Sequence, residues 1–203
     1  MHTSRETFKA RALNHLRESA ELKLSTMEEC AQDIMVAAET LAFSIKAGNK
    51  ILLCGNGGSA ADCQHTAAEL VSLMEKNFSR SPIPAIALTT DTSFITAFSN
   101  DFGFEGIFER QVMALAHRGD VLIGISTSGN STNILRAIQS ANKLGLKTIG
   151  LTGAGGQIQS LVTTCVSVPS VNTQYIQETH LAIEHILCDL IECILFNKAS
   201  QHS

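Results

Sequence analysis

Two residues near the middle of the chain have types and spacing that suit a metal site. His65 and Glu69 are four residues apart in a segment of helical periodicity, so both side chains emerge from one face of the helix. An imidazole and a carboxylate placed in this way can take adjacent positions on zinc or a similar divalent ion. The same spacing also arises on solvated helix faces that bind no metal. The pair by itself leaves both interpretations open.

A second group of polar residues interrupts an apolar helical segment near the C-terminus. It comprises Gln177, Glu178, His180, Glu184 and His185. Gln177 and His185 are two turns apart and about 80° offset, which allows both to reach one ion if the helix passes obliquely. His180 and Glu184 are expected on the flanking polar face. The alternative for the whole group is a set of surface residues, or of core residues whose polar atoms find protein partners.

Two loops of small residues could hold a phosphate. Residues 55–59 read Gly-Asn-Gly-Gly-Ser and residues 126–131 read Ser-Thr-Ser-Gly-Asn-Ser, each between an apolar run and a helical segment. A loop of this kind brings backbone amides and a helix N-terminus close to an anion. Neither loop contains Lys or Arg, which favours a sugar phosphate bound by directed hydrogen bonds. Ordinary strand-to-helix turns share this composition, so one loop alone would not decide.

Other phosphate motifs are disfavoured by their spacing. The chain has no G-x-x-x-x-G-K-[ST] sequence, so a Walker A nucleotide site is not expected. Residues 55–60 match the G-x-G-x-x-A pattern of dinucleotide-binding folds, which require an acidic residue about 20 positions further on. The first acid after the second predicted strand is Asp91, which lies too far away.

The elements that must position these residues follow from the hydrophobic periodicity. Strands are predicted at 51–54, 85–88, 121–125, 148–151 and 165–168, and helices at 60–75, 104–116, 131–144, 157–163 and 175–196. This alternation is typical of an α/β fold, a three-layer αβα sandwich with a five-stranded parallel sheet.

Two further helices are predicted before the sheet. The second opens with a capping box formed by Ser25 and Glu28 and ends at Gly48. This segment, about residues 1–48, is expected to pack against a partner subunit or against its own core. No boundary for another domain is visible, so residues 1–203 are interpreted as one domain.

Composition excludes several classes of protein. The 203 residues are 44% hydrophobic and 17% charged, and the formal net charge is −4, so neither a disordered chain nor a broad nucleic-acid-binding surface is expected. No apolar run approaches the roughly 18 residues that span a membrane, and no signal peptide is recognised. The six cysteines form no C-x-x-C pair, as in a cytoplasmic protein with reduced thiols.

Taken in order, these motifs resemble the sugar isomerase (SIS) domain family and, within it, the bacterial phosphoheptose isomerases. The resemblance covers about residues 48–195. The segments that carry it are 54–62, 64–65, 85–91, 100–104, 119–131 and 176–178. A single G-N-G-G-S sequence would not be specific, whereas the ordered set is.

The resemblance implies a ligand set and a substrate site. It assigns one zinc ion (Zn²⁺) per subunit to His65, Glu69, Gln177 and His185. It assigns substrate contacts to Asn56, Gly57, Gly58, Ser59, Asn100, Asp101, Ser126, Thr127, Ser128, Ser131 and Gln177. It further implies a homotetramer in which the N-terminal helices join the subunits and the active sites lie between them, with no nucleic-acid or membrane partner.

The implied activity is the isomerisation of sedoheptulose 7-phosphate to D-glycero-D-manno-heptose 7-phosphate, the first step toward nucleotide-activated heptose for lipopolysaccharide or other surface glycans. Such a reaction moves a proton through an enediolate, so it needs a base and an electrophile. Glu69 and His185 are the predicted catalytic residues, with Glu69 moving the proton. The alternatives are a non-catalytic relative that binds the replication initiator and a sugar-phosphate sensor; the complete ligand set favours the enzyme.

Two departures from the family pattern bear on the substrate. Many members have a shorter segment in place of 70–81, with an Arg near the position of Leu73 that reaches a neighbouring subunit's site. Lys76 and Arg80 are the candidates to replace it. Tyr175 stands where an Arg is common.

Overall fold

A single parallel sheet forms the centre of the computed structural model, which describes residues 5–197. Its strands are β1 (Ile51–Gly55), β2 (Ala85–Ala87), β3 (Val121–Ser126), β4 (Lys147–Thr152) and β5 (Thr164–Ser167). They lie in the order β2-β1-β3-β4-β5, and every neighbouring pair is parallel. The five strand predictions are confirmed to within a residue at either end.

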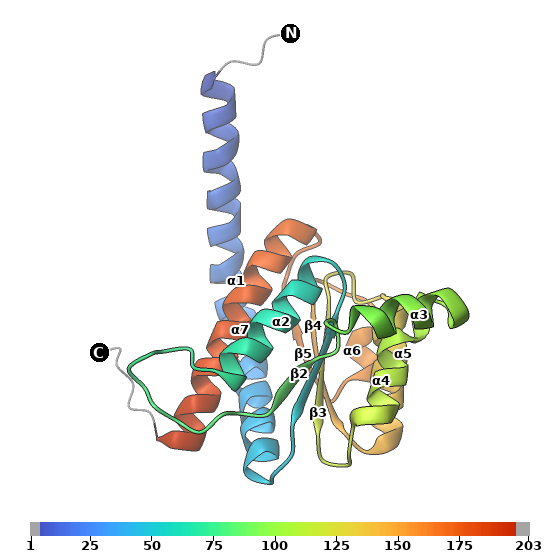
Figure 1. Cartoon of the computed structure of the whole chain (residues 1–203). Helices are drawn as coiled ribbons and strands as arrows, with labels where there is room; N and C mark the ends of the chain where they lie inside the picture. Colours follow the sequence, from blue (N-terminus) through green and yellow to red (C-terminus); the bar gives the residue numbers. More distant parts are fainter. Residues whose placement is uncertain (1–4, 198–203) are drawn as a thin grey trace.

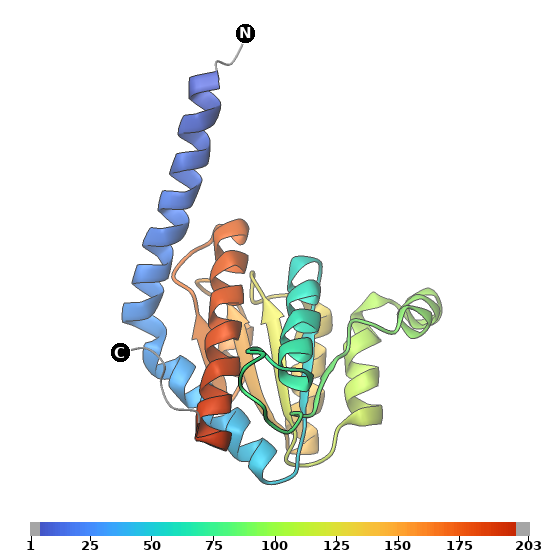
Figure 2. The ribbon, with the colours of Figure 1, turned by 60° about the vertical axis from the view of Figure 1, so that its left-hand side comes forward.

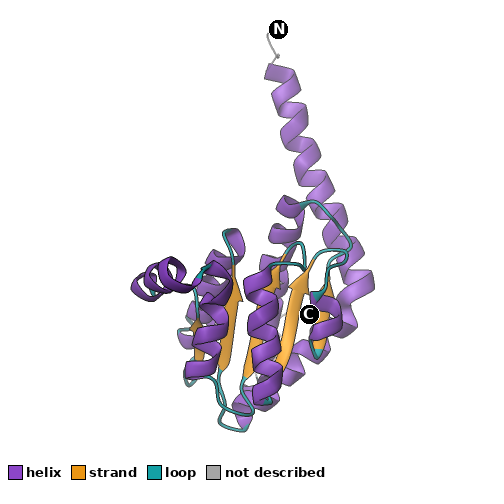
Figure 3. Cartoon of the chain, turned by 90° about the vertical axis from the view of Figure 1, so that its right-hand side faces the viewer, coloured by secondary structure: helices purple, strands orange, loops and turns teal. Residues whose placement is uncertain are grey.

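Helices cover both faces of this sheet, which gives the predicted three layers (Figure 3). Successive residues of β1 point to opposite sides: Leu53 packs with α1 (Arg5–Lys46), α2 (Gly58–Val71) and α7 (Thr173–Phe196). Leu52 packs instead with α4 (Ile107–Leu115), α5 (Thr132–Leu144) and α6 (Ile158–Leu161). Burial on both faces explains why the strands read as continuous apolar runs.

The N-terminal segment is one helix of 42 residues, so the prediction of two helices is wrong. The hydroxyl of Ser25 donates to the carbonyl of Glu21, and that of Thr26 donates to Leu22. Both bonds return to the preceding turn, which leaves the helix intact. No Gly or Pro stands before Ser25 in this segment to end a first helix. The first half of α1 extends well beyond the rest of the molecule (Figures 1 and 2).

A helix that the sequence analysis did not predict, α3 (Thr92–Phe102), follows β2. Its N-cap is Asp91, whose carboxylate accepts the backbone amide of Phe94 at 2.9 Å. Phe94, Phe98 and Phe102 form a stripe with successive ring centroids 5.4 and 5.0 Å apart. None of its residues is fully buried, and the helix projects from the side of the molecule (Figure 1). The cap and the i, i+4 aromatic stripe were the signals that could have found it.

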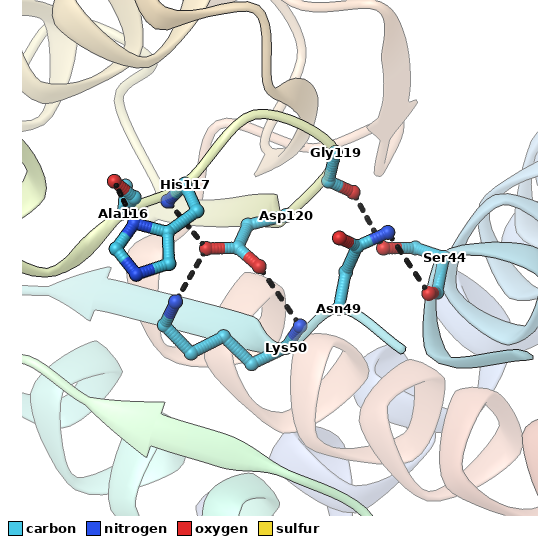
Figure 4. Close-up of polar contacts among 7 residues, drawn as sticks. All are labelled: Ser44, Asn49, Lys50, Ala116, His117, Gly119 and Asp120. Atoms are coloured by element: carbon cyan, nitrogen blue, oxygen red, sulfur yellow. Dashed lines mark hydrogen bonds and ion pairs between the residues drawn. The ribbon is translucent and has the colours of Figure 1, made fainter. Parts of the chain in front are cut away.

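The N-terminal ends of β1 and β3 are tied together by Asp120 (Figure 4). Its carboxylate accepts the backbone N–H of Lys50 at 2.9 Å, the Nζ of Lys50 at 2.6 Å and the backbone N–H of His117 at 2.7 Å. Burial acts to raise the pKa of Asp120, but these hydrogen bonds outweigh it and lower the pKa. The Ser44 hydroxyl donates to Gly119 and joins the end of α1 to the same corner. The register of β1 against β3 is thereby fixed at the end opposite the two loops.

Candidate functional site

The two predicted phosphate loops lie side by side at the point where the sheet reverses its strand order. β1 and β3 are neighbours, with Gly55 opposite Ile125. The chain turns from β1 to α2 on one face of the sheet and from β3 to α5 on the other. Open α/β sheets bind their ligands in the crevice between two such diverging loops.

The first loop is shaped by close contact with α7. A Cβ atom at Gly58 would lie 2.6 Å from Nε2 of Gln177, so a side chain at the start of α2 would push the Gln177 amide out of its present place. Gly57 has a φ of 57°, a conformation that side chains disfavour. Gly58 therefore leaves room for the Gln177 amide at the N-terminus of α2, so the last helix contacts the first loop.

Asn56 of the first loop is bonded to a residue that the sequence analysis missed. Its side-chain amide and that of Asn133 exchange two reciprocal hydrogen bonds, both of 2.9 Å. Asn133 is buried in the first turn of α5. The pair holds the first loop against the helix that follows the second loop. The only signal in the sequence was a polar residue adjoining the apolar pair Ile134 and Leu135.

Hydroxyl groups gather in the second loop. The Oγ atoms of Ser126 and Ser131 are 3.0 Å apart, and those of Ser126 and Ser128 are 3.5 Å apart. Ser131 is the N-cap of α5, but its hydroxyl makes no capping bond. Gly129 has a φ of 65°, and a Cβ there would lie 2.6 Å from the carbonyl oxygen of Gly155. The loop is thus packed tightly while its hydroxyls face one another without a cation in the loop, as a neutral anion cradle requires.

Two predicted metal ligands meet across the interface of α2 and α7. The Nε2 atoms of His65 and His185 are 2.9 Å apart. Their rings are nearly perpendicular, at 85°. Two unprotonated ring nitrogens at this distance would repel each other, so either one donates a proton to the other or a cation replaces that proton. The pair therefore has the donor chemistry of a metal site.

The other two predicted ligands, Glu69 and Gln177, differ in how near they lie to this histidine pair. The Oε1 of Glu69 lies 3.9 Å from the Nε2 of His65, one helical turn along α2. Gln177 contacts Gly58, two turns earlier on that helix than His65. Within residues 5–197, no group of three or more His, Cys, Asp or Glu side chains is arranged closely enough to hold a metal ion. The structure brings together His65, His185 and, more loosely, Glu69.

Comparisons with known proteins show the family to which the chain is related. A family model described as the SIS domain matches residues 14–153. The chain belongs to the SIS domain family. Among curated relatives, a phosphoheptose isomerase from Aquifex aeolicus is 55% identical over 177 residues, covering 87% of this chain and 92% of the relative. One from Maridesulfovibrio salexigens is 45% identical over 197 residues, covering 97% and 95%.

Solved structures give the same result for this SIS domain. A phosphoheptose isomerase from Neisseria gonorrhoeae matches with a TM-score of 0.86 and 41% identity, covering 92% of this chain and 99% of that one. One from Francisella tularensis matches with a TM-score of 0.87 and 40% identity, covering 91% and 98%. Both the fold and the resemblance drawn from the sequence motifs are confirmed.

His180 and Glu184 of the SIS domain are buried, so their expected place on a polar face is wrong. The Nε2 of His180 donates to the carbonyl of Thr152 at 3.1 Å, and burial lowers its pKa to about 4. The Oε2 of Glu184 accepts the hydroxyl of Thr66 at 2.9 Å. Burial raises the pKa of Glu184 to about 8. Helix α7 packs against α1, α2 and β4, which leaves little of its circumference for a polar face.

The buried His180 predicts a specific loss of stability in acid. Because its pKa is about 4 in the folded chain and 6.5 is the ordinary value, the unfolded chain binds the extra proton between these values. The free energy of unfolding should therefore fall as the pH is lowered from about 6.5 to about 4. His180→Gln keeps an N–H for Thr152 and should flatten this part of a Tm-against-pH curve. The exposed His117→Gln variant should keep the wild-type curve; equal curves for all three proteins would contradict the assignment.

Asn100 and Asp101, two predicted substrate contacts, lie at the end of α3. The amide of Asn100 donates to the carboxylate of Asp101 at 2.8 Å. Asp101 also lines an open groove of about 710 Å³ between α3 and α4, beside the Phe94 and Phe98 rings. In the described part of this SIS domain, no hydrogen bond joins either residue to the two loops. Their role in substrate binding stays a prediction.

The replacements suggested for the family's arginine differ in exposure. Arg80 has a side chain only 1% exposed and paired with Glu192, so it cannot extend toward a neighbouring subunit as suggested. Lys76 is exposed and stays the candidate. Tyr175 lies edge-on to His15, at 4.7 Å between ring centroids, and the nearby Glu18 carboxylate raises the pKa of its hydroxyl. This residue of the SIS domain therefore faces α1.

Two further expectations concern the cysteines and membrane-spanning helices. No disulfide joins the six cysteines, all of which lie in the described part. Among residues 5–197, no helix combines the length and apolar character that crossing a membrane requires.

Proposed function

We propose that this chain is a phosphoheptose isomerase that interconverts sedoheptulose 7-phosphate and D-glycero-D-manno-heptose 7-phosphate. The observation that carries the proposal is the meeting of His65, His185 and Glu69 on α2 and α7 in a chain that also presents a neutral hydroxyl cradle at the carboxyl end of β3. The phosphoheptose isomerases that match over nearly the whole chain support it. An acid-base group next to a phosphate cradle is the minimum that a sugar-phosphate isomerase needs.

The reaction transfers one proton between the two carbons that carry the carbonyl and the neighbouring hydroxyl. We assign the proton transfer to Glu69, whose carboxylate is 22% exposed and so reachable from solvent. It removes the proton from one carbon and returns it to the other. His185 moves the second proton, from the oxygen of the reacting hydroxyl to the oxygen of the reacting carbonyl. The phosphate, held in the second loop, fixes where the reacting carbons lie relative to these groups.

We further propose that the protein holds one zinc ion per chain through His65, Glu69, Gln177 and His185. Two imidazoles and a carboxylate are ordinary zinc ligands, and the facing ring nitrogens support the assignment. Gln177 is neutral, so the set carries a single negative charge. When bound, zinc supplies a Lewis acid that polarises a carbonyl and its adjacent hydroxyl.

The hydroxyl cradle predicts a change in substrate affinity. Changing Ser126 and Ser128 together to Ala should raise KM for the ketose phosphate, because each lost hydrogen bond to a charged group is worth on the order of 1.5–3 kcal/mol. That corresponds to roughly 10-fold or more per bond. Steady-state kinetics would measure it, with Ser25→Ala as the control because that hydroxyl bonds only within α1 among the described contacts. An unchanged KM in the double variant would place the phosphate elsewhere.

Exchange of solvent deuterium tests the function directly. In D₂O with added zinc, the wild-type protein should introduce deuterium into sedoheptulose 7-phosphate at the carbon beside the carbonyl, followed by NMR. An adaptor or a sensor would bind without exchange. Absence of exchange with several ketose phosphates would overturn the proposed function.

The quaternary state and compartment complete the proposal. We infer a homotetramer in which α1 contacts other subunits, because large apolar side chains of this helix are exposed, among them Phe8, Leu16 and Met27. Sedimentation would measure the assembly, and a monomer at micromolar concentration would contradict it. The cysteines without disulfides and a phosphorylated substrate agree with a cytoplasmic location.

A further inference from the structure

The segment after α2 folds back and buries an arginine beneath the candidate site. The side chains of Arg80 and Glu192 are each only 1% exposed. The Nε of Arg80 donates to the Oε1 of Glu192 at 2.7 Å. A buried ion pair is a poor source of stability, because apolar residues of similar volume commonly stabilise a protein as well or better. The pair therefore calls for a role other than stability.

The remaining nitrogens of Arg80 bind the end of α2. One terminal nitrogen donates to the carbonyl of Leu70 at 2.9 Å, and the other donates to the carbonyl of Glu69 at 2.8 Å. The last carbonyls of a helix have no partner within it. A single planar guanidinium thus caps the last turn of α2 and binds α7 at the same time, which a point charge could not do.

The position of this link relates it to the site. Glu69 supplies both the carbonyl that Arg80 binds and the carboxylate that faces His65. Glu192 lies seven residues after His185, which is nearly two full turns and hence the same face of α7. The link therefore joins the two helices that carry His65 and His185. The 2.9 Å approach of these histidines depends on the spacing between α2 and α7.

We propose that Arg80 is a positioning residue of the isomerase site: by joining the Glu69 turn of α2 to Glu192 of α7, it sets the spacing at which His65, Glu69 and His185 act together. The inference rests on the proposed function for its kinetic consequence. Arg80 lies below these residues and acts through the helices that carry them.

Arg80→Lys is the first test. Lysine keeps the charge, but its three donors share one nitrogen and cannot span acceptors that Arg80 reaches from three separate nitrogens. We expect kcat to fall by about 10-fold or more with KM for sedoheptulose 7-phosphate within about twofold, and zinc affinity to fall by about 10- to 100-fold, as for other groups that support metal ligands. Arg136→Lys is the matched control, because Arg136 forms an exposed pair with Glu109 between α5 and α4. It should leave all three quantities within about twofold.

A second variant separates positioning from stability. Arg80→Met with Glu192→Leu removes both buried charges together, which is often neutral or stabilising, but it also removes the donor to the Glu69 carbonyl, so the Tm should stay within about 4 °C of that of the wild type. If Arg80 positions the site, kcat and zinc affinity stay low in this stable protein. Wild-type kcat and zinc affinity in either Arg80 variant would overturn the inference. Zinc titration of the purified proteins tests the positioning role of Arg80 independently of turnover. Failure of the wild type to isomerise the ketose phosphate would refute only the proposed function.

Discussion

Glu69→Gln is expected to lower kcat for sedoheptulose 7-phosphate by about 10²–10⁴-fold, the usual contribution of a positioned acid or base. Glutamine has the size of glutamate and keeps an oxygen toward His65, so metal content should change much less than turnover. The substituted amide cannot accept the proton of a C–H bond. Single-turnover rates at saturating substrate would measure the effect on the chemical step.

Two controls make this prediction specific. Glu39→Gln alters an exposed carboxylate of α1 and should leave kcat unchanged. Binding of inorganic phosphate to Glu69→Gln should match the wild type, because the second loop is untouched. A variant that retains more than about a tenth of the wild-type kcat would exclude Glu69 as the base.

Replacing His65 by Ala should remove both the metal and the activity. The variant loses one of the two ring nitrogens that meet at 2.9 Å, so a single imidazole, a carboxylate and a neutral amide are left to hold the ion. Because metal polarisation contributes several kcal/mol and about 1.4 kcal/mol is tenfold in rate, kcat/KM should fall by at least about 10³-fold. Metal analysis of the purified protein and the exchange assay would measure the two effects.

The histidine control comes from the opposite end of the sheet. His117 follows α4 next to the Asp120 network and is exposed, so His117→Ala should retain one metal ion per chain and full turnover. The His65→Ala protein should keep its elution volume and far-UV circular dichroism, since His65 is a partly exposed side chain. A full complement of zinc in folded His65→Ala would rule out the proposed metal site.

The sequence by itself determined the scaffold that positions this site. Buried parallel strands must be continuously apolar, as Ile51 to Cys54 are, and the amphipathic segments between them must cover two faces. The Gly-rich and Ser-rich loops were visible for the same local reason, because a close approach of backbone and a helix start restrict residue type. Weak local signals led to errors. The Ser25 capping box did not interrupt the continuous helix α1, and α3 was not predicted.

Apart from what the family resemblance implied, only the tertiary structure decided which polar residues meet. His65 and His185 are separated by 120 positions, and helical periodicity gives the face of each but not the crossing of α2 over α7. The same packing buried His180 and Glu184, which a single-helix view assigns to solvent, and it made Arg80 a buried link between the two helices. The periodicity of a sequence segment predicts on which face of its own helix or strand a side chain lies. Its partners depend on how distant elements pack, because burial and spacing are properties of the assembled core.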